Sequence, residues 1–237
     1  MNGNILYKDI PINFEIEYKK RKTFAIEIIP PNKIKVKSPR GISKSKIEEL
    51  VHSKANWIIK KLEEFRDIEH RQIERKFVDG EIFMYLGKEY ILKITQDKNL
   101  KKAEVSICNE FIHVKTPKTE IEIIKKIMIE WYKIECDKKI RERIEVYGQK
   151  LGEMPRIIKV KEQKRRWGTC TSRRDVLFNW KCIMAPIDVI DYIVVHELCH
   201  LVHMNHSANF WSLVKSNFPH YEEKKQWLRK NGIKIEF

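Results

Sequence analysis

The residues with the clearest chemical potential lie together in the stretch VVHELCHLVHMNHSANFW, residues 194–211. His196 and His200 are four positions apart in an HExxH pattern. On a helix they are separated by about 40° of rotation and about 6 Å of rise, so they can bind one ion from adjacent turns. Glu197 stands beside them, where a carboxylate can act as a general base on a metal-bound water. Burying these polar groups in so apolar a helix without a ligand would cost several kcal/mol. The pattern therefore predicts a zinc site.

A hydrolytic zinc site needs a third protein ligand and an open fourth position, and two histidines compete for that role. His203 lies within about 20° of His196 around the helix, but about 10.5 Å further along its axis. Asparagine tolerates the left-handed conformation, so a turn at Asn205 could bring His206 back to the ion, with Ser207 capping the next helix. Axial reach favours His206 and leaves His203 as the alternative, at a partly exposed helix position.

The elements that must position these residues can be read from hydrophobic periodicity. Helical spacing predicts helices over 119–152, 187–203, 207–218 and 220–231, with two strands, 156–172 and 176–184, before the HExxH helix. The first part of the chain alternates as strands over 12–20, 23–30 and 33–39, followed by a helix over about 43–75 and by hairpins over 81–94 and 103–117. No internal repeat is evident, and the charged stretch 66–76 is the best candidate for a hinge.

The composition restricts the classes of partner. The five cysteines are dispersed and form no CxxC pair, so we expect them to be reduced. No apolar run approaches the roughly 18–20 residues that cross a bilayer, and the first residues are not those of a secretory signal, so we expect a cytoplasmic protein with no membrane contact. The formal net charge of +15 would attract nucleic acid. The alternative is a lysine-rich proteome that raises the charge of every protein.

Three motifs resemble those of a known family. RRWGTCTS at 165–172, LFNWKCIMAP at 177–186 and YIVVHELCHLVHMNHSANFW at 192–211 are similar to the YgjP-like zinc metallopeptidases, which are related to the SprT-like and WLM metalloproteases of the gluzincin type. Thr169 stands where the family usually has serine. The N-terminal half resembles the family more weakly, in SPRGIS and WIIKKL among other segments.

The resemblance implies a set of site residues. One zinc ion per chain would be held by His196, His200 and His206, with Glu197 as the catalytic base. In related proteases the strand before the active-site helix is an edge that can pair with an extended substrate. Here that strand would be 176–182, so the expected substrate contacts are Phe178, Asn179 and Trp180. For Trp180, as for Trp167, the alternative is core packing.

The fold class expected from these elements and from the resemblance is α+β. A β-rich region, 1–118, would contain one helix and serve recognition or regulation. Residues 119–237 would form a zincin-like metallopeptidase domain of the SprT or gluzincin type, with the HExxH helix inside it.

The expected function is zinc-dependent hydrolysis of peptide bonds in a protein or peptide substrate, by a zinc-bound water that Glu197 activates. Because of the net charge of +15, we include DNA-associated proteins among the expected substrates. A nucleic-acid-binding accessory protein with a structural zinc site is the alternative, although a structural site needs no base such as Glu197. Arg165 and Arg166 fit either a nucleic-acid patch or ion pairs. By residue type alone, the candidates for oxyanion stabilisation are Tyr192, His203 and His220.

Overall fold

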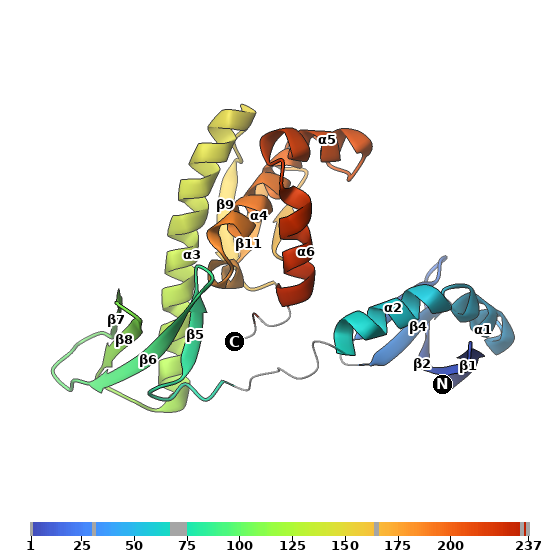
Figure 1. Cartoon of the computed structure of the whole chain (residues 1–237), viewed down its shortest axis with the longest axis horizontal. Helices are drawn as coiled ribbons and strands as arrows, with labels where there is room; N and C mark the ends of the chain where they lie inside the picture. Colours follow the sequence, from blue (N-terminus) through green and yellow to red (C-terminus); the bar gives the residue numbers. More distant parts are fainter. Residues whose placement is uncertain (1, 30–31, 67–74, 164–165, 233–234, 236–237) are drawn as a thin grey trace. The chain divides into compact units, whose positions relative to one another are not determined.

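The computed structural model of the chain describes residues 2–29, 32–66, 75–163, 166–232 and 235 (Figure 1). The fold is mixed α+β, with a β-rich N-terminal half and helices concentrated in the C-terminal half. The chain divides into two compact units, Met1–Gln72 and Ile73–Phe237. Within the described residues, no helix is both long enough and apolar enough to cross a membrane.

The first unit is a four-stranded sheet covered by two helices. Its strands are β1 (Asn2–Tyr7), β2 (Ile10–Lys19), β3 (Ala25–Ile29) and β4 (Lys33–Pro39), and its helices are α1 (Lys44–Ser53) and α2 (Ala55–Arg66). Alternate residues of β2 and β4 face the helices, as the sequence alternation predicts. The buried residues form a separate hydrophobic core: Ile12, Phe14, Ile16, Ile34, Val36, Ile47, Val51, Ala55 and Ile58.

The single helix expected over about 43–75 is two helices. Ser43 caps α1 by accepting a hydrogen bond from the backbone N–H of Lys46 at 3.4 Å, close to the start expected at about residue 43. Lys54 ends this helix with φ −107° and ψ 7°, and α2 begins at the next residue. Residues 67–74, which include most of the expected hinge, lie outside the described residues.

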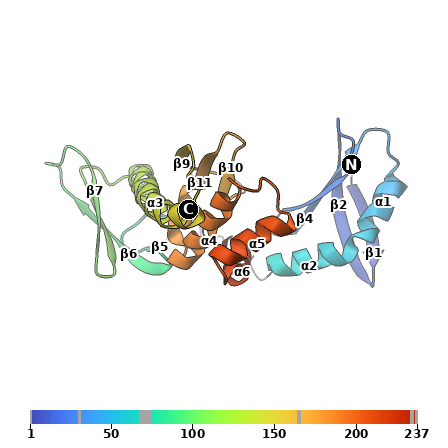
Figure 2. The same cartoon turned by 90° about the horizontal axis from the view of Figure 1, so that it is seen from above.

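The second unit contains two sheets and the long helix α3 (Ile121–Leu151) between them (Figure 2). One sheet consists of β5 (Ile82–Tyr85), β6 (Lys88–Gln96), β7 (Glu104–Cys108) and β8 (Phe111–Thr116). The other consists of β9 (Ile157–Lys161), β10 (Gly168–Cys170) and β11 (Asp175–Asn179). A 3-10 helix, η2 (Trp180–Met184), leads to α4 (Ile187–Cys199), α5 (Ala208–Asn217) and α6 (Tyr221–Asn231).

Helix α3 joins both sheets to one hydrophobic core. About every fourth residue of it is fully buried: Ile124, Met128, Tyr132, Cys136, Ile140 and Ile144. This core also contains Leu92 and Val114 of the β5–β8 sheet and Ile190 of α4. The division between the units therefore falls at 72/73 and differs from the expected boundary after residue 118, because the β5–β8 sheet packs with α3.

The two four-stranded sheets have the same topology. Their strand orders are β1-β2-β4-β3 and β5-β6-β8-β7, and in each sheet the outer pairs are antiparallel and the central pair is parallel. The register of the parallel pair also agrees, because residues that lie opposite each other are 20 positions apart in both sheets. Glu15 lies opposite Lys35 in the first sheet, and Lys93 lies opposite His113 in the second. Each sheet is followed by a helix that packs on it. We conclude that the chain contains two copies of one ββββα module.

Local details support this duplication. Both first hairpins turn through two residues with positive φ, at 8–9 and 86–87. Strand β4 ends in VKSP, and β8 ends in VKT with Pro117 directly after it. Each strand places a buried hydroxyl, Ser38 or Thr116, just before the proline. The expectation that the chain has no repeat is therefore wrong. Half-buried strands share alternating patterns in any case, so strand pairing was needed to reveal the repeat.

One polar contact fixes α3 against α4. Asp191, which is 7% exposed, accepts hydrogen bonds from Arg143 Nε at 2.5 Å and Nη2 at 2.9 Å, and a third from the Tyr147 hydroxyl at 3.0 Å. A bidentate carboxylate–guanidinium pair defines the relative orientation of two helices more closely than apolar packing does.

We expect Asp191→Ala to lower the free energy of unfolding by roughly 2–4 kcal/mol, because Arg143 would remain charged and mostly buried with only the longer contact to Glu142. The matched control is Asp137→Ala, which removes the exposed pair with Arg141 on the same helix. That change should cost less than about 1 kcal/mol. Urea unfolding of both variants measures the difference, and equal losses would show that the buried pair has no special role.

Candidate metal centre

Helix α4 carries the HExxH residues into the core. It begins after Pro186, and nearly every side chain from Val189 to Cys199 is buried, as the apolar sequence predicts. Glu197 is 6% exposed, while His200 is the C-cap and is 8% exposed. The polar end of this helix is therefore enclosed by apolar residues on most sides.

The chain leaves α4 by a route different from the expected one. The helix ends at Cys199, so His203 is not at a helix position. Asn205 is not among the described residues with positive φ, so the expected left-handed turn there is wrong. Instead, the side-chain oxygen of Asn205 accepts a hydrogen bond from the Ser207 N–H at 3.3 Å. Ser207 caps α5 by accepting from the Phe210 N–H at 3.4 Å, as expected.

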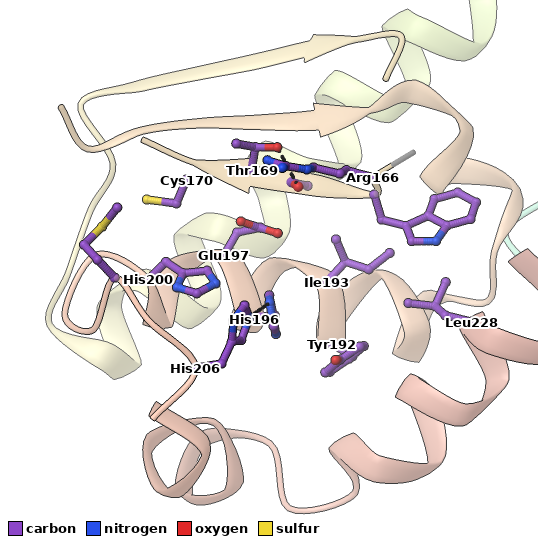
Figure 3. A pocket seen from close by; sticks show the side chains of 13 residues that line it. Arg166, Thr169, Cys170, Tyr192, Ile193, His196, Glu197, His200, His206 and Leu228 are labelled. Atoms are coloured by element: carbon purple, nitrogen blue, oxygen red, sulfur yellow. Dashed lines mark hydrogen bonds between the residues drawn. The ribbon is translucent and has the colours of Figure 1, made fainter. Parts of the chain in front are cut away.

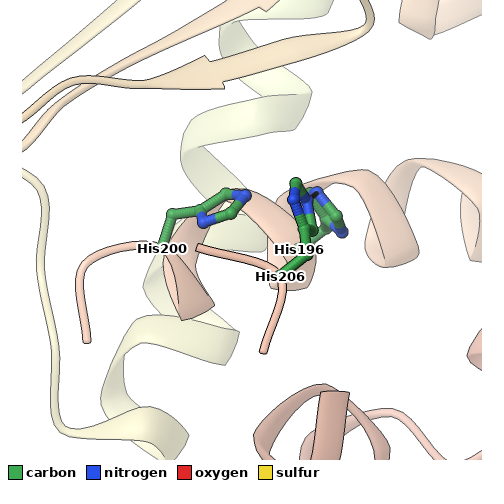
Figure 4. Close-up of side chains that lie close together, drawn as sticks. All are labelled: His196, His200 and His206. Carbon is green, nitrogen blue, oxygen red and sulfur yellow. Dashed lines mark hydrogen bonds between the residues drawn. The ribbon is translucent and has the colours of Figure 1, made fainter. Parts of the chain in front are cut away.

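This route brings three imidazoles together (Figure 4). One nitrogen from each of His196, His200 and His206 lies within 4.8 Å of the other two. The Nε2 atoms of His196 and His206 are 3.1 Å apart. Two nitrogens bound to one tetrahedral zinc ion are separated by roughly 3.4 Å. The donor set and spacing therefore fit a zinc ion.

His203 contributes through its backbone. Its carbonyl oxygen lies 3.0 Å from Nδ1 of His200. A carbonyl can only accept, so Nδ1 carries the proton and Nε2 of His200 is left with a free lone pair for a metal. The His203 side chain does not line the pocket described below.

Aromatic rings hold the imidazoles in place. Phe210 is fully buried and stacks on His200 with ring centroids 4.4 Å apart. Trp211 stacks on His206 at 5.6 Å. Burial, followed by the neighbouring histidines and Lys225, lowers the pKa of His196 to about 3. Its Nδ1 is buried without a hydrogen-bond partner among the described atoms. A neutral imidazole is the form that binds metals.

Glu197 is held by the strand β10 (Figure 3). A Cβ atom added to Gly168 would lie 2.5–2.7 Å from Cγ, Oε1 and Cδ of Glu197, so the carboxylate occupies the space that glycine leaves. The backbone N–H of Cys170 hydrogen-bonds to this carboxylate. Burial raises the pKa of Glu197 to about 8, against the opposing effects of Arg166 and of that hydrogen bond.

These groups line one pocket of about 510 Å³. Residues 166–170 form one wall, and the other sides come from Tyr192, Ile193, Met204, Leu228 and the HExxH residues. Arg166 is exposed, and Figure 3 shows its side chain reaching along this wall toward Thr169. Of the oxyanion candidates expected by residue type, only Tyr192 lines the pocket. Arg165 lies outside the described residues.

The strand expected to pair with a substrate, 176–182, does not lie at the edge of its sheet. Strand β11 pairs with β10 on one side and with β9 on the other, so it is the centre of its sheet and cannot accept another strand. Phe178, Asn179 and Trp180 are all at most 5% exposed, which leaves them inaccessible to a substrate. Among the described strands, the edge beside the pocket is β10.

Neither Gly168 nor Cys170 is among the site residues expected from the sequence. Both belong to RRWGTCTS, a motif noted only for its resemblance to a family. A glycine within a strand is itself a signal, because it commonly marks a close approach by another group. The contact of β10 with Glu197 depends on how β10 packs against α4, and the spacing of residues in the sequence does not show this packing.

The buried carboxyl group predicts a pH-dependent stability. Between about pH 4.5 and about pH 8, the metal-free folded protein holds a proton on Glu197 that the unfolded chain has lost. Stability should therefore fall as pH rises through this range, by a few kcal/mol relative to Glu197→Gln. Urea unfolding with a chelator at several pH values measures the difference between the two proteins. If the free energy of unfolding changes with pH in the same way in both proteins, Glu197 does not titrate in this range.

The family comparison agrees with the geometry. A family model described as YgjP-like, metallopeptidase domain, matches residues 22–231, which is most of the chain. No curated protein matches the chain significantly. The resemblance expected from the sequence motifs is thus confirmed, and the chain belongs to the YgjP-like metallopeptidase family.

Proposed function

We propose that this metallopeptidase binds one zinc ion through His196, His200 and His206 and uses Glu197 as its general base. The observation that carries the proposal is that three converging imidazoles and a buried carboxylate line the same pocket. This arrangement fits a zincin-like site, in which the metal keeps an open position for substrate.

Each group has a distinct task. A zinc ion held by the three histidines would polarise the scissile carbonyl and make water more acidic. Glu197 accepts the proton of the attacking water and passes it to the leaving amine. Gly168 and the Cys170 N–H hold the carboxylate in position for both transfers. Arg166 and Tyr192 are the pocket side chains whose donors could stabilise the negative charge that develops on the carbonyl oxygen.

The substrate would pair with the outer edge of β10, at the backbone groups that do not bond to Glu197. Backbone hydrogen bonds to an edge strand bind an extended peptide with little sequence preference, which suits a peptidase. The extension to DNA-associated proteins is supported by the net charge of +15. A structural zinc site in an accessory protein remains the alternative, but it gives no reason to bury a carboxylate beside the histidines at a free-energy cost.

The ligand assignment predicts a contrast between two neighbouring histidines. His206→Ala should reduce zinc content well below one ion per chain, because the remaining ligands come from α4 alone. His203→Ala should retain zinc, because the contact with His200 uses the backbone carbonyl. Metal analysis of both purified variants measures this. The reverse result would exchange the roles of the two residues.

The base assignment predicts a loss of hydrolysis without loss of metal. Glu197→Gln should lower cleavage of an unfolded protein such as casein by at least about 10²-fold, while zinc stays near one per chain. Gly168→Ala should also reduce cleavage, because the added methyl group displaces the carboxylate.

Thr169→Ser is the matched control in the same strand, because its hydroxyl can keep the hydrogen bond to Gln163. This variant should remain active. An active Glu197→Gln protein would refute the proposed base, and a zinc-loaded wild type that cuts no protein or peptide would refute the peptidase assignment.

A further inference from the structure

The two copies of the module can be compared at the end of the sheet where the two central parallel strands finish. In the first copy, Lys19 at the end of β2 lies opposite Pro39 at the end of β4. The segments that follow these strands therefore leave the sheet side by side. The Tyr18 hydroxyl donates a hydrogen bond to the carbonyl of Ile42 at 3.1 Å and joins them. In the second copy, Gln96 Nε2 donates to the carbonyl of Pro117 at 3.2 Å in the equivalent place.

In the first copy this end of the sheet is strongly cationic. We call it the basic end, and it consists of Lys20, Arg21, Lys22, Arg40 and Lys46. The segments 18–24 and 39–46 contain no Asp or Glu. In the described part of the chain, none of these five side chains forms an ion pair, and Nε of Arg21 is buried with no hydrogen-bond partner.

The basic end is not explained by the stability of the unit. Helices favour acidic residues in their first turn, because the helix dipole is positive there. The first turn of α1 has no acidic residue and carries Lys44 and Lys46 instead. This arrangement is unfavourable within the folded chain and would be relieved by a bound anion.

Other lysines of the same unit are neutralised. On the open face of the sheet, Lys33 and Lys35 form ion pairs with Glu15 at 2.8 and 3.7 Å, and Lys37 pairs with Glu27 at 2.7 Å. Among the described residues, the five cations of the basic end have no such ion-pair partners, unlike these three lysines of the open face. A general enrichment in lysine would not produce this separation.

The second copy lacks a comparable surface. The same end carries Lys98, Lys101, Lys102 and Lys118, but also Asp97, Glu120 and Glu122. Glu122 lies in the first turn of α3, the usual place for an acidic residue. The second copy is part of the core that holds the metal centre, whereas the first has a core of its own. The excess of cations is therefore specific to the copy that is free to bind something else.

We propose that the basic end binds the sugar–phosphate backbone of a nucleic acid. A lipid surface requires an apolar anchor beside the cations, and a protein interface usually has an apolar centre. None of the exposed large apolar residues lies in 18–24 or 39–46. An apolar pocket lined by Phe24, Leu50 and Trp57 adjoins the first segment, so the test below includes anionic vesicles. Phosphate contacts need only positively charged donors, and they bind with little regard to sequence. Binding there would keep the proposed peptidase near proteins bound to nucleic acid.

The test is fluorescence anisotropy of a short labelled DNA duplex with the full-length, zinc-loaded chain, at salt concentrations between roughly 0.05 and 0.2 M. The variant is Lys20→Gln/Arg21→Gln/Lys22→Gln. It should bind at least about tenfold more weakly and reduce the slope of log K against log salt by about 3, one unit for each lost contact. Circular dichroism checks that the variant is folded, and zinc content checks the metal centre.

The matched control is Lys33→Gln/Lys35→Gln/Lys37→Gln, which makes the same change in net charge on the ion-paired face. It should bind DNA within about twofold of the wild type, because these lysines have no free charge to offer. An equal loss in both variants would overturn the proposal. So would salt-independent binding by the wild type, or tighter binding of polyglutamate or anionic vesicles than of DNA. Each result is independent of peptidase activity, so a failure here leaves the proposed function untouched.

Discussion

The close approach of β10 to the end of α4 is the contact on which the site depends. It is possible because Gly168 has no side chain, so the backbone can lie against the carboxylate of Glu197. The same approach removes water from that carboxylate and raises its pKa to about 8. It also puts the outer edge of β10 beside the three histidines. The missing side chain of Gly168 thus determines where the proposed base lies and how readily it is protonated. It also determines where an extended chain could bind.

Apolar packing offsets the free-energy cost of burying this polar cluster. Helix α4 is buried along most of its length, and α3 and α5 contact it. Phe210 and Trp211 then fix the imidazoles that protrude from its end. The Asp191–Arg143 pair supplies orientation where apolar contacts are less specific. A rigid apolar scaffold around a few polar groups is what a pre-organised metal site requires.

The duplicated module shows one fold in two settings. The second copy is tied to the metal-bearing half by α3 and by its first hairpin, whose Leu86 and Gly87 N–H groups donate to the carbonyls of Ile183 and Met184 at 2.8 and 3.1 Å. The first copy keeps the same strand order and register but closes its own core. Its surface is therefore free to differ, and it carries the basic end.

The sequence by itself determined the local geometry. Helical pitch pairs His196 with His200 and sets Glu197 beside them, and strand alternation identifies which residues are buried. Only the tertiary structure decided which strand is the edge, because alternation reveals burial but not the neighbouring strand. For the same reason the repeat escaped the sequence analysis, and Gly168 had no assigned role. The convergence of His206, and the use of His203 through its backbone, depend on the turn after α4, whose course residue spacing does not determine.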